Sequence, residues 1–224
     1  MINISAAAEA AFIGYAFRRL FFLNNKTRSI VLNIICVFLI SYNLYRYVWL
    51  SFETGRLHIP VEFSALSYFL VPSIVLLNIP FLRVWAAYSG LLAGGCYFLC
   101  MSVFGDMVYA NYQLSSIVTA LVNHGMLLLC GLLLISEKEF SFYSRWLLTA
   151  GLIFVGLHSL LMRGYFSGGR GIFIYELLFA FYPIEFFGGG IIPFYYILLF
   201  LLVILSFSIF YKLNNIMMKK QLLK

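Results

Sequence analysis

Long apolar runs constrain what this chain can fold into more than any other feature of its sequence. A helix needs about 20 mostly apolar residues to cross the hydrocarbon core of a bilayer. Of the 224 residues, 63% are hydrophobic and only 10% are charged, too few charges to cover a soluble fold of this length. We therefore expect the bilayer to be the solvent for most of the chain. Six runs qualify as spans: residues 29–52, 60–79, 81–104, 115–136, 145–163 and 191–212.

The lysines and arginines indicate which side of the membrane each connection faces. Cytoplasmic connections are enriched in these residues. They gather before the first run, in the turn at 80–83, in the loop at 137–145 and after the last run. The sequence thus predicts an all-α, polytopic transmembrane helical bundle with about six spans and both termini inside (N-in, C-in), located in the cell membrane.

The whole chain, residues 1–224, is expected to form a single transmembrane domain. Its predicted parts are an N-terminal amphipathic, cytoplasmic segment (1–28), the six-helix bundle (29–212) and a basic cytoplasmic tail (213–224).

Two segments outside the six spans have alternative interpretations. Residues 6–23 are apolar but short, and a basic pair interrupts them near their end, which is typical of an interfacial amphipathic helix. A further membrane span is the alternative. The outer connection at 164–190 is long, nearly apolar and rich in glycine, which favours a lid or a re-entrant element over a free loop.

Charge and cysteine content exclude several classes of protein. The net charge of +7 does not indicate nucleic-acid binding, because the basic residues sit at the ends of spans rather than on a polar domain. All four cysteines lie in apolar runs; Cys96 and Cys100 share one helix face, a poor disulfide geometry. We expect membrane lipids as partners, and neither a cofactor nor a bound metal; the sequence does not indicate protein partners.

Four ionisable residues inside the predicted spans are the best candidates for a functional site. They are Arg46, Glu62, His124 and His158. Each costs several kcal/mol in lipid unless it is paired or faces a polar cavity. A rise of about 1.5 Å per residue places all four within roughly 5–15 Å of the outer interface. We interpret this layer as a polar cavity that opens outward; packing histidines and an Arg46–Glu62 pair are the alternative.

The residue types in this layer suggest acyl chemistry. Acyl transfer needs a nucleophile, a base within hydrogen-bond reach and a group that stabilises the oxyanion. Ser64 is the candidate nucleophile and His124 the candidate base, with Asn123 as a possible oxyanion donor. The remaining candidates support or bind substrate: Arg46, Glu62, His158, and Tyr195 and Tyr196 at the start of the last span.

Three short motifs resemble the TMEM164/YwaF family of integral membrane proteins. The stretch from His58 to Ser64 (His-Ile-Pro-Val-Glu-Phe-Ser) is similar to the family's Leu-Pro-Leu-His-Leu-Cys element. A later Asn-His-Gly at His124 and an Ile-Pro-Phe-Tyr-Tyr opening of the last span, ending at Tyr196, are similar to its other hallmarks. The resemblance covers roughly residues 28–212.

The resemblance implies an intramembrane lipid hydrolase or acyltransferase, as in the similar AIG1/ADTRP-type enzymes. Ser64 then takes the place of the family cysteine and His124 that of the catalytic histidine. Glu62 replaces the family histidine two residues before the nucleophile, so altered chemistry or an inactive member is an open alternative. A serine needs more help from a base than a cysteine does, because a hydroxyl ionises far less readily than a thiol.

Two other functions remain open at the level of sequence. A non-catalytic membrane protein, such as a transporter subunit or an assembly partner, needs no nucleophile. A metal-dependent hydrolase would use Glu62, His124 and His158 as three ligands of an open zinc site.

Overall fold

The structure, a computed structural model, describes residues 1–166 and 192–222. Every regular element in this part is helical, and it holds no strand. Four helical segments are long and apolar enough to cross a membrane: α2, α4, α5 and residues Phe200–Gln221 of α9. The prediction of an all-helical membrane bundle is confirmed at this level. The elements are α1 (Ile2–Phe21), α2 (Asn25–Thr54), α3 (Phe63–Leu76), α4 (Arg83–Val108), α5 (Leu114–Ile135), the 3₁₀ turn η1 (Phe142–Ser144), α6 (Arg145–Phe166) and α9 (Ile192–Leu222).

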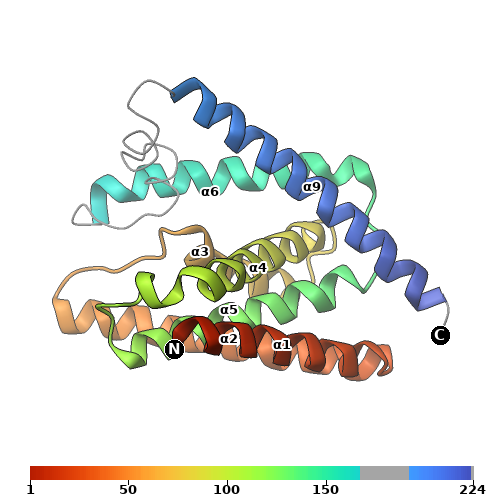
Figure 1. Cartoon of the computed structure of the whole chain (residues 1–224), viewed down its shortest axis with the longest axis horizontal. Helices are drawn as coiled ribbons and strands as arrows, with labels where there is room; N and C mark the ends of the chain where they lie inside the picture. Colours follow the sequence, from red (N-terminus) through yellow and green to blue (C-terminus); the bar gives the residue numbers. More distant parts are fainter. Residues whose placement is uncertain (167–191, 223–224) are drawn as a thin grey trace.

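The helices α1 to α5 pack together, and α6 and α9 lie along one side of this group (Figure 1). Two aromatic residues of α4 connect the two groups of helices. A Cβ on Gly151 of α6 would lie 2.3 Å from the Trp85 ring, so only a glycine allows α6 to approach this closely. The Tyr88 hydroxyl hydrogen-bonds Ser206 of α9 at 2.8 Å, and the Tyr88 ring packs edge-on against Phe207.

The tightest helix contact joins α4 and α5, the helix that carries His124. A Cβ on Gly94 would lie 2.8 Å from the carbonyl oxygen of His124, and a Cβ on Gly131 would lie 2.5 Å from the backbone nitrogen of Leu91. In lipid, small residues that let two backbones approach are a main source of helix association. The glycines of these two helices therefore fix the position of His124 relative to α4.

Helix α1 packs along the bundle. Its residues Ala6, Ile13 and Phe21 are at most 5% exposed. At its start, the backbone nitrogen of Ile2 donates to Asp106 at the end of α4 at 2.6 Å. The buried residues therefore extend over nearly the whole length of α1.

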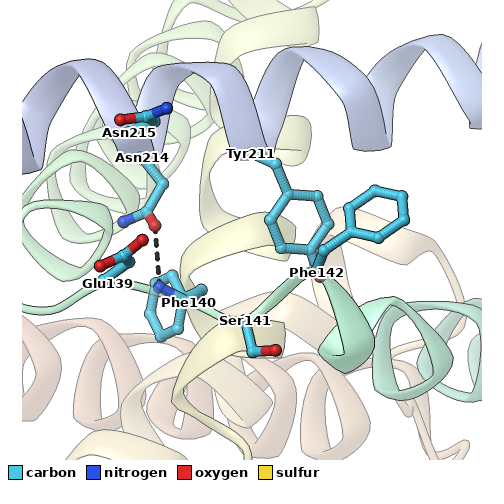
Figure 2. Close-up of a pocket in the computed structure, with 7 residues that line it drawn as sticks. All are labelled: Glu139, Phe140, Ser141, Phe142, Tyr211, Asn214 and Asn215. Atoms are coloured by element: carbon cyan, nitrogen blue, oxygen red, sulfur yellow. Dashed lines mark hydrogen bonds between the residues drawn. The ribbon is translucent and has the colours of Figure 1, made fainter.

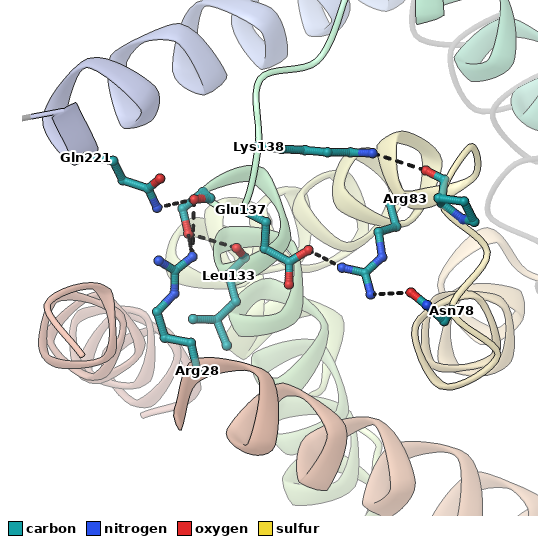
Figure 3. Close-up of polar contacts among 9 residues, drawn as sticks. Arg28, Asn78, Arg83, Leu133, Glu137, Lys138 and Gln221 are labelled. Atoms are coloured by element: carbon teal, nitrogen blue, oxygen red, sulfur yellow. Dashed lines mark hydrogen bonds and ion pairs between the residues drawn. The ribbon is translucent and has the colours of Figure 1, made fainter. Parts of the chain in front are cut away.

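One end of the bundle, which we call the basic end, gathers polar contacts from five helices (Figure 3). Arg28 of α2 donates to the Ser136 carbonyl and hydroxyl oxygens at 3.2 and 2.9 Å. Arg83 of α4 pairs with Glu137, and Gln221 of α9 donates to the Ser136 carbonyl. The end of α1 also lies here, because the Arg28 guanidinium is 6.0 Å from the Phe21 ring.

The start of α1 and the end of α9 lie at opposite ends of the bundle. Asp106, which contacts the start of α1, is at the far end of α4 from Arg83, while Gln221 is at the basic end. The described part of the chain contains seven α-helices, α1 to α6 and α9. The number of membrane spans and the side that each terminus faces stay predictions.

Candidate functional site

His124 lies near the middle of α5 and is 9% exposed. Its Nδ1 is 2.7 Å from the carbonyl oxygen of Ala120, one turn earlier. The Tyr68 hydroxyl of α3 is 3.0 Å from Nδ1 and 3.2 Å from Nε2. A neutral imidazole carries one donor and one acceptor, and a carbonyl oxygen only accepts. This network therefore assigns the proton to Nδ1 and leaves the Nε2 lone pair to accept the Tyr68 hydroxyl.

Aromatic rings hold the imidazole in place. The Tyr97 ring of α4 stacks on it at a centroid distance of 3.7 Å and an angle of 8°, and the Tyr68 ring meets it edge-on at 82°. The Tyr97 hydroxyl bonds the Tyr109 hydroxyl at 3.0 Å. We call His124, Tyr68, Tyr97 and Tyr109 the His124 cluster. Residues from three helices and from the end of α4 thus hold a buried base in place. Its Nε2 lone pair accepts the hydroxyl of Tyr68.

Ser64 lies one helical turn before Tyr68, on the same face of α3. The Ser64 side chain lies close enough to the Tyr68 side chain to influence it. His124 makes its own hydrogen bonds with Tyr68 and Ala120. Ser64 and His124, the predicted nucleophile and base, are therefore both neighbours of the phenol of Tyr68, a residue that sequence reasoning did not single out.

The start of α3 shapes the surroundings of Ser64. The helix begins at Phe63, with Glu62 as an extended N-cap residue that makes no side-chain cap hydrogen bond. The first backbone N–H groups of a helix have no partner within it. The first hydrogen bond here runs from the Leu66 nitrogen to the Glu62 carbonyl oxygen. Ser64 thus sits among the N–H groups of residues 63–65, and Glu62 lies outside the regular helix.

Asn123 points away from this group of side chains. It is fully buried and exchanges two hydrogen bonds with Asn43 of α2, at 3.2 and 3.3 Å. The Asn43 amide also donates to the Leu39 carbonyl oxygen at 2.8 Å. Because the two amides are paired with each other, Asn123 acts as a packing contact between α2 and α5 in this structure.

His158 binds the connection that leads into α3. Its Nε2 lies 3.0 Å from the Pro60 carbonyl oxygen, and the neighbouring Ser159 hydroxyl donates to the Val61 carbonyl oxygen at 2.6 Å. Helix α6 therefore holds the segment immediately before Glu62 and Ser64. This geometry agrees with a supporting role for His158, whose side chain bonds the backbone just before α3.

The two predicted charged residues lie nearer the surface. Arg46 and Glu62 are both exposed, and both lie close enough to Tyr47 for their charges to act on it. Elsewhere in the described residues, Arg83 pairs with Glu137 and Asp106 with the amino group of Met1. The side chains of Tyr195 and Tyr196 fall outside the part of the structure that is described, as does nearly all of the connection at 164–190.

A carboxylate that the sequence interpretation missed lies beside the His124 cluster. Glu9 of α1 is half-buried, and its Oε1 lies 2.8 Å from the position of a Cβ on Gly125, next to His124. Its charge also acts on Tyr97, which stacks on the histidine. Glu9 escaped notice because it lies in residues 6–23, outside the predicted spans. Tyr68 could have been found from the sequence, because it lies four residues after Ser64 and so on the same face of the helix.

Two pockets formed by the described residues lie away from Ser64 and His124. One of about 550 Å³ lies between the α5–α6 connection and α9, and another of about 690 Å³ lies on the outer face of α2 around Tyr42. The described residues contain no group of three histidine, cysteine or acidic side chains that would hold a metal. Glu62, His124 and His158 accordingly form no zinc site in this part of the chain.

Comparison with known proteins adds no relative. No protein-family model, no curated protein and no solved structure matches this chain.

Proposed function

We propose that this membrane protein hydrolyses or transfers the acyl group of a lipid or fatty-acyl ester, with Ser64 as nucleophile and His124 as base. The observation that supports this most is the Tyr68 hydroxyl, which is hydrogen-bonded to His124 and lies close to Ser64, one helical turn earlier. A buried neutral histidine at the end of such a chain is suited to accept a proton. Motif resemblance to lipid hydrolases points the same way.

The proposed step moves two protons in sequence. As Ser64 Oγ attacks the ester carbonyl carbon, its proton passes to Tyr68 Oη and the Tyr68 proton passes to His124 Nε2. The Nδ1–H bond to Ala120 then stabilises the imidazolium. The return of that proton along the same path neutralises the departing alkoxide as the ester C–O bond breaks. Water or an acceptor alcohol then releases the acyl group from Ser64 and regenerates the hydroxyl.

The negative charge that develops on the carbonyl oxygen needs donors that stay in place. Asn123 is engaged with Asn43, so we assign this role to the unpaired backbone N–H groups at the start of α3. A helix N-terminus favours negative charge. The His158 contact with Pro60 would position this turn, and the exposed Arg46 would bind the anionic part of a lipid.

The proposed topology has seven antiparallel helices crossing the cell membrane, with α9 ending and α1 beginning on opposite sides. The basic end faces the cytoplasm by the positive-inside rule. Ser64, at the start of α3, then opens toward the outer leaflet, where Tyr195 and Tyr196 enter the last helix.

The decisive experiment measures hydrolysis of acyl-ester lipids by Ser64→Ala and His124→Ala variants, together with labelling by a fluorophosphonate probe. We expect both variants to lose activity by at least about 100-fold, as for removal of a nucleophile or base. Ser67→Ala is the matched control, because Ser67 donates to its own helix at the Phe63 carbonyl oxygen. Undiminished turnover in both variants would overturn the proposal.

A non-catalytic role is the second candidate. The observation that favours it is that the hydrogen bonds of His124 are satisfied by Tyr68 and Ala120 and its ring is enclosed by two tyrosines, as expected for a histidine that only packs helices. Under this alternative the same variants lose thermal stability, and the fluorophosphonate probe labels no residue that depends on Ser64.

A further inference from the structure

A pocket of about 550 Å³ lies at the basic end, between α9 and the connection from α5 to α6. Figure 2 shows Asn214 and Tyr211 reaching down from α9 toward the connection that carries Glu139 to Phe142, with Asn215 lying along α9 beside them. This volume is in the range of small-molecule sites. The lining residues are Glu139, Phe140, Ser141, Phe142, Tyr211, Asn214 and Asn215.

The frame of the pocket is held by hydrogen bonds. Asn214 accepts from the Phe140 nitrogen at 2.8 Å and donates to the carbonyl oxygens of Ile135 and Lys138 at 2.7 and 2.9 Å. The Tyr211 hydroxyl bonds the Ser144 hydroxyl at 2.9 Å. These four contacts tie α9 to both ends of the connection, so the pocket is preformed.

Two polar groups in the lining lack such contacts. Glu139 and Asn215 are exposed, and in the described residues neither side chain has a hydrogen-bond or ion-pair partner. A carboxylate and an amide oxygen facing the same space are acceptors for a cationic donor group.

Two cations flank the same space. The Arg145 guanidinium lies 4.6 Å from the Phe142 ring centroid, and the Lys138 ammonium lies 5.8 Å from that of Phe140. Both rings line the pocket, so positive charge stands at its edge while the carboxylate of Glu139 lines it. This arrangement complements a ligand that carries one positive and one negative group.

The position of the pocket selects the source of that ligand. It lies where α5 has ended and α6 begins, next to Tyr211 and Lys212, the first polar residues after the apolar part of α9. Aromatic and basic residues mark the headgroup level of a bilayer. We propose that this pocket binds the headgroup of phosphatidylethanolamine, with its ammonium on Glu139 and Asn215 and its phosphate near Arg145 and Lys138.

The pocket favours a primary ammonium over the quaternary ammonium of choline. Choline lipids have no N–H donors and are recognised by open aromatic faces. Here the face of Phe142 is occupied by Arg145, and Phe140 stacks on Phe210 at 5.9 Å. The free groups of the lining are hydrogen-bond acceptors, which match three N–H donors of an ethanolamine headgroup.

Native mass spectrometry of the purified full chain tests this with dihexanoyl phosphatidylethanolamine, phosphatidylcholine and phosphatidylglycerol. We expect the ethanolamine lipid to bind at least about fivefold more tightly than either of the others, as charge-assisted hydrogen bonds allow. In Glu139→Gln the preference should fall to within about twofold, with the phosphatidylglycerol affinity unchanged or increased.

Glu53→Gln is the matched control, because Glu53 is also exposed but lies near the end of α2, at the opposite end of the bundle. It should keep the full preference, and unchanged thermal midpoints would show that all variants are folded. Equal binding of the three lipids by the unmodified chain would overturn the proposal, and so would a preference that survives Glu139→Gln or phosphatidylcholine binding as tight as phosphatidylethanolamine binding.

Discussion

The His124 cluster and the basic end both contain buried polar side chains, but these side chains bond different kinds of partner. At the basic end, Asn214 bonds backbone carbonyls and an N–H group, and Arg28 bonds the Ser136 carbonyl oxygen together with its hydroxyl. In the His124 cluster, a phenol and an imidazole bond each other across two helices. Side-chain partners can change protonation state together, whereas backbone partners cannot. We infer that the basic end holds the fold and that the His124 cluster is the place for chemistry.

The largest effect should come from Asn214→Ala at the basic end. This change leaves the buried N–H of Phe140 and the carbonyl oxygen of Ile135 without partners. Each unsatisfied group costs about 1–3 kcal/mol, so we expect a loss of about 3 kcal/mol in unfolding free energy. Thermal unfolding in detergent measures it. Asn215→Ala is the neighbouring control, and a destabilisation equal to that of Asn214→Ala would remove the structural role assigned here.

Tyr68→Phe should reverse this pattern, with little change in stability but a loss of catalysis. The variant keeps the ring that packs edge-on against His124 and deletes only the hydroxyl that bonds the imidazole, the group that would carry the Ser64 proton in the proposed step. Proton transfer by a positioned side chain contributes typically 10²–10⁴-fold, so we expect acyl-ester turnover to fall by about 100-fold. Tyr97→Phe deletes a hydroxyl that faces Tyr109 instead and should retain most of the activity. Equal losses in the two variants would contradict a proton path through Tyr68.

The smallest expected effect concerns the buried Asn43–Asn123 pair. The pair lies beside the His124 cluster, but we expect it to stabilise the fold, as the contacts at the basic end do. Asn123→Leu alone leaves the Asn43 carbonyl oxygen without its donor and should cost about 2 kcal/mol. Replacement of both asparagines by leucine should recover most of that loss, because two apolar groups leave nothing unsatisfied. Thermal midpoints of the two single variants and the double variant form the required cycle. Additive losses would show that the two amides act independently.

The helices were predictable because apolar runs of this length have few other uses. Residues 115–136 correspond closely to α5 (Leu114–Ile135), and 29–52 lie within α2 (Asn25–Thr54). The run at 60–79 overstated α3, which begins at Phe63 because Pro60 and the N-cap Glu62 precede it. The packing of α1 could not be predicted, because Glu9, Arg18 and Arg19 lower its hydropathy and its buried face shows only in contacts with α4 and α5.

The candidate site was predictable in part. Ser64 and His124 could be found from residue type and depth, and the connection between them could not. Tyr68 resembles the many other tyrosines of the chain until the structure places its hydroxyl beside an imidazole. Asn123 was assigned by adjacency to His124, but neighbours on a helix point about 100° apart. That rotation turns it toward Asn43 of α2.

The packing of α1 also sets the order in which this chain can assemble. Asn3 and Asp106 are 103 positions apart, and the side chain of Asn3 accepts from the backbone nitrogen of Asp106 at 2.7 Å. During synthesis the first helix therefore emerges long before the surface that will cover it. Until α4 and α5 have been inserted, the Glu9 carboxylate of this helix cannot take its half-buried position beside Gly125. Helix α1 is thus made well before the helices that cover it, and a chain truncated before α4 would leave it without these partners.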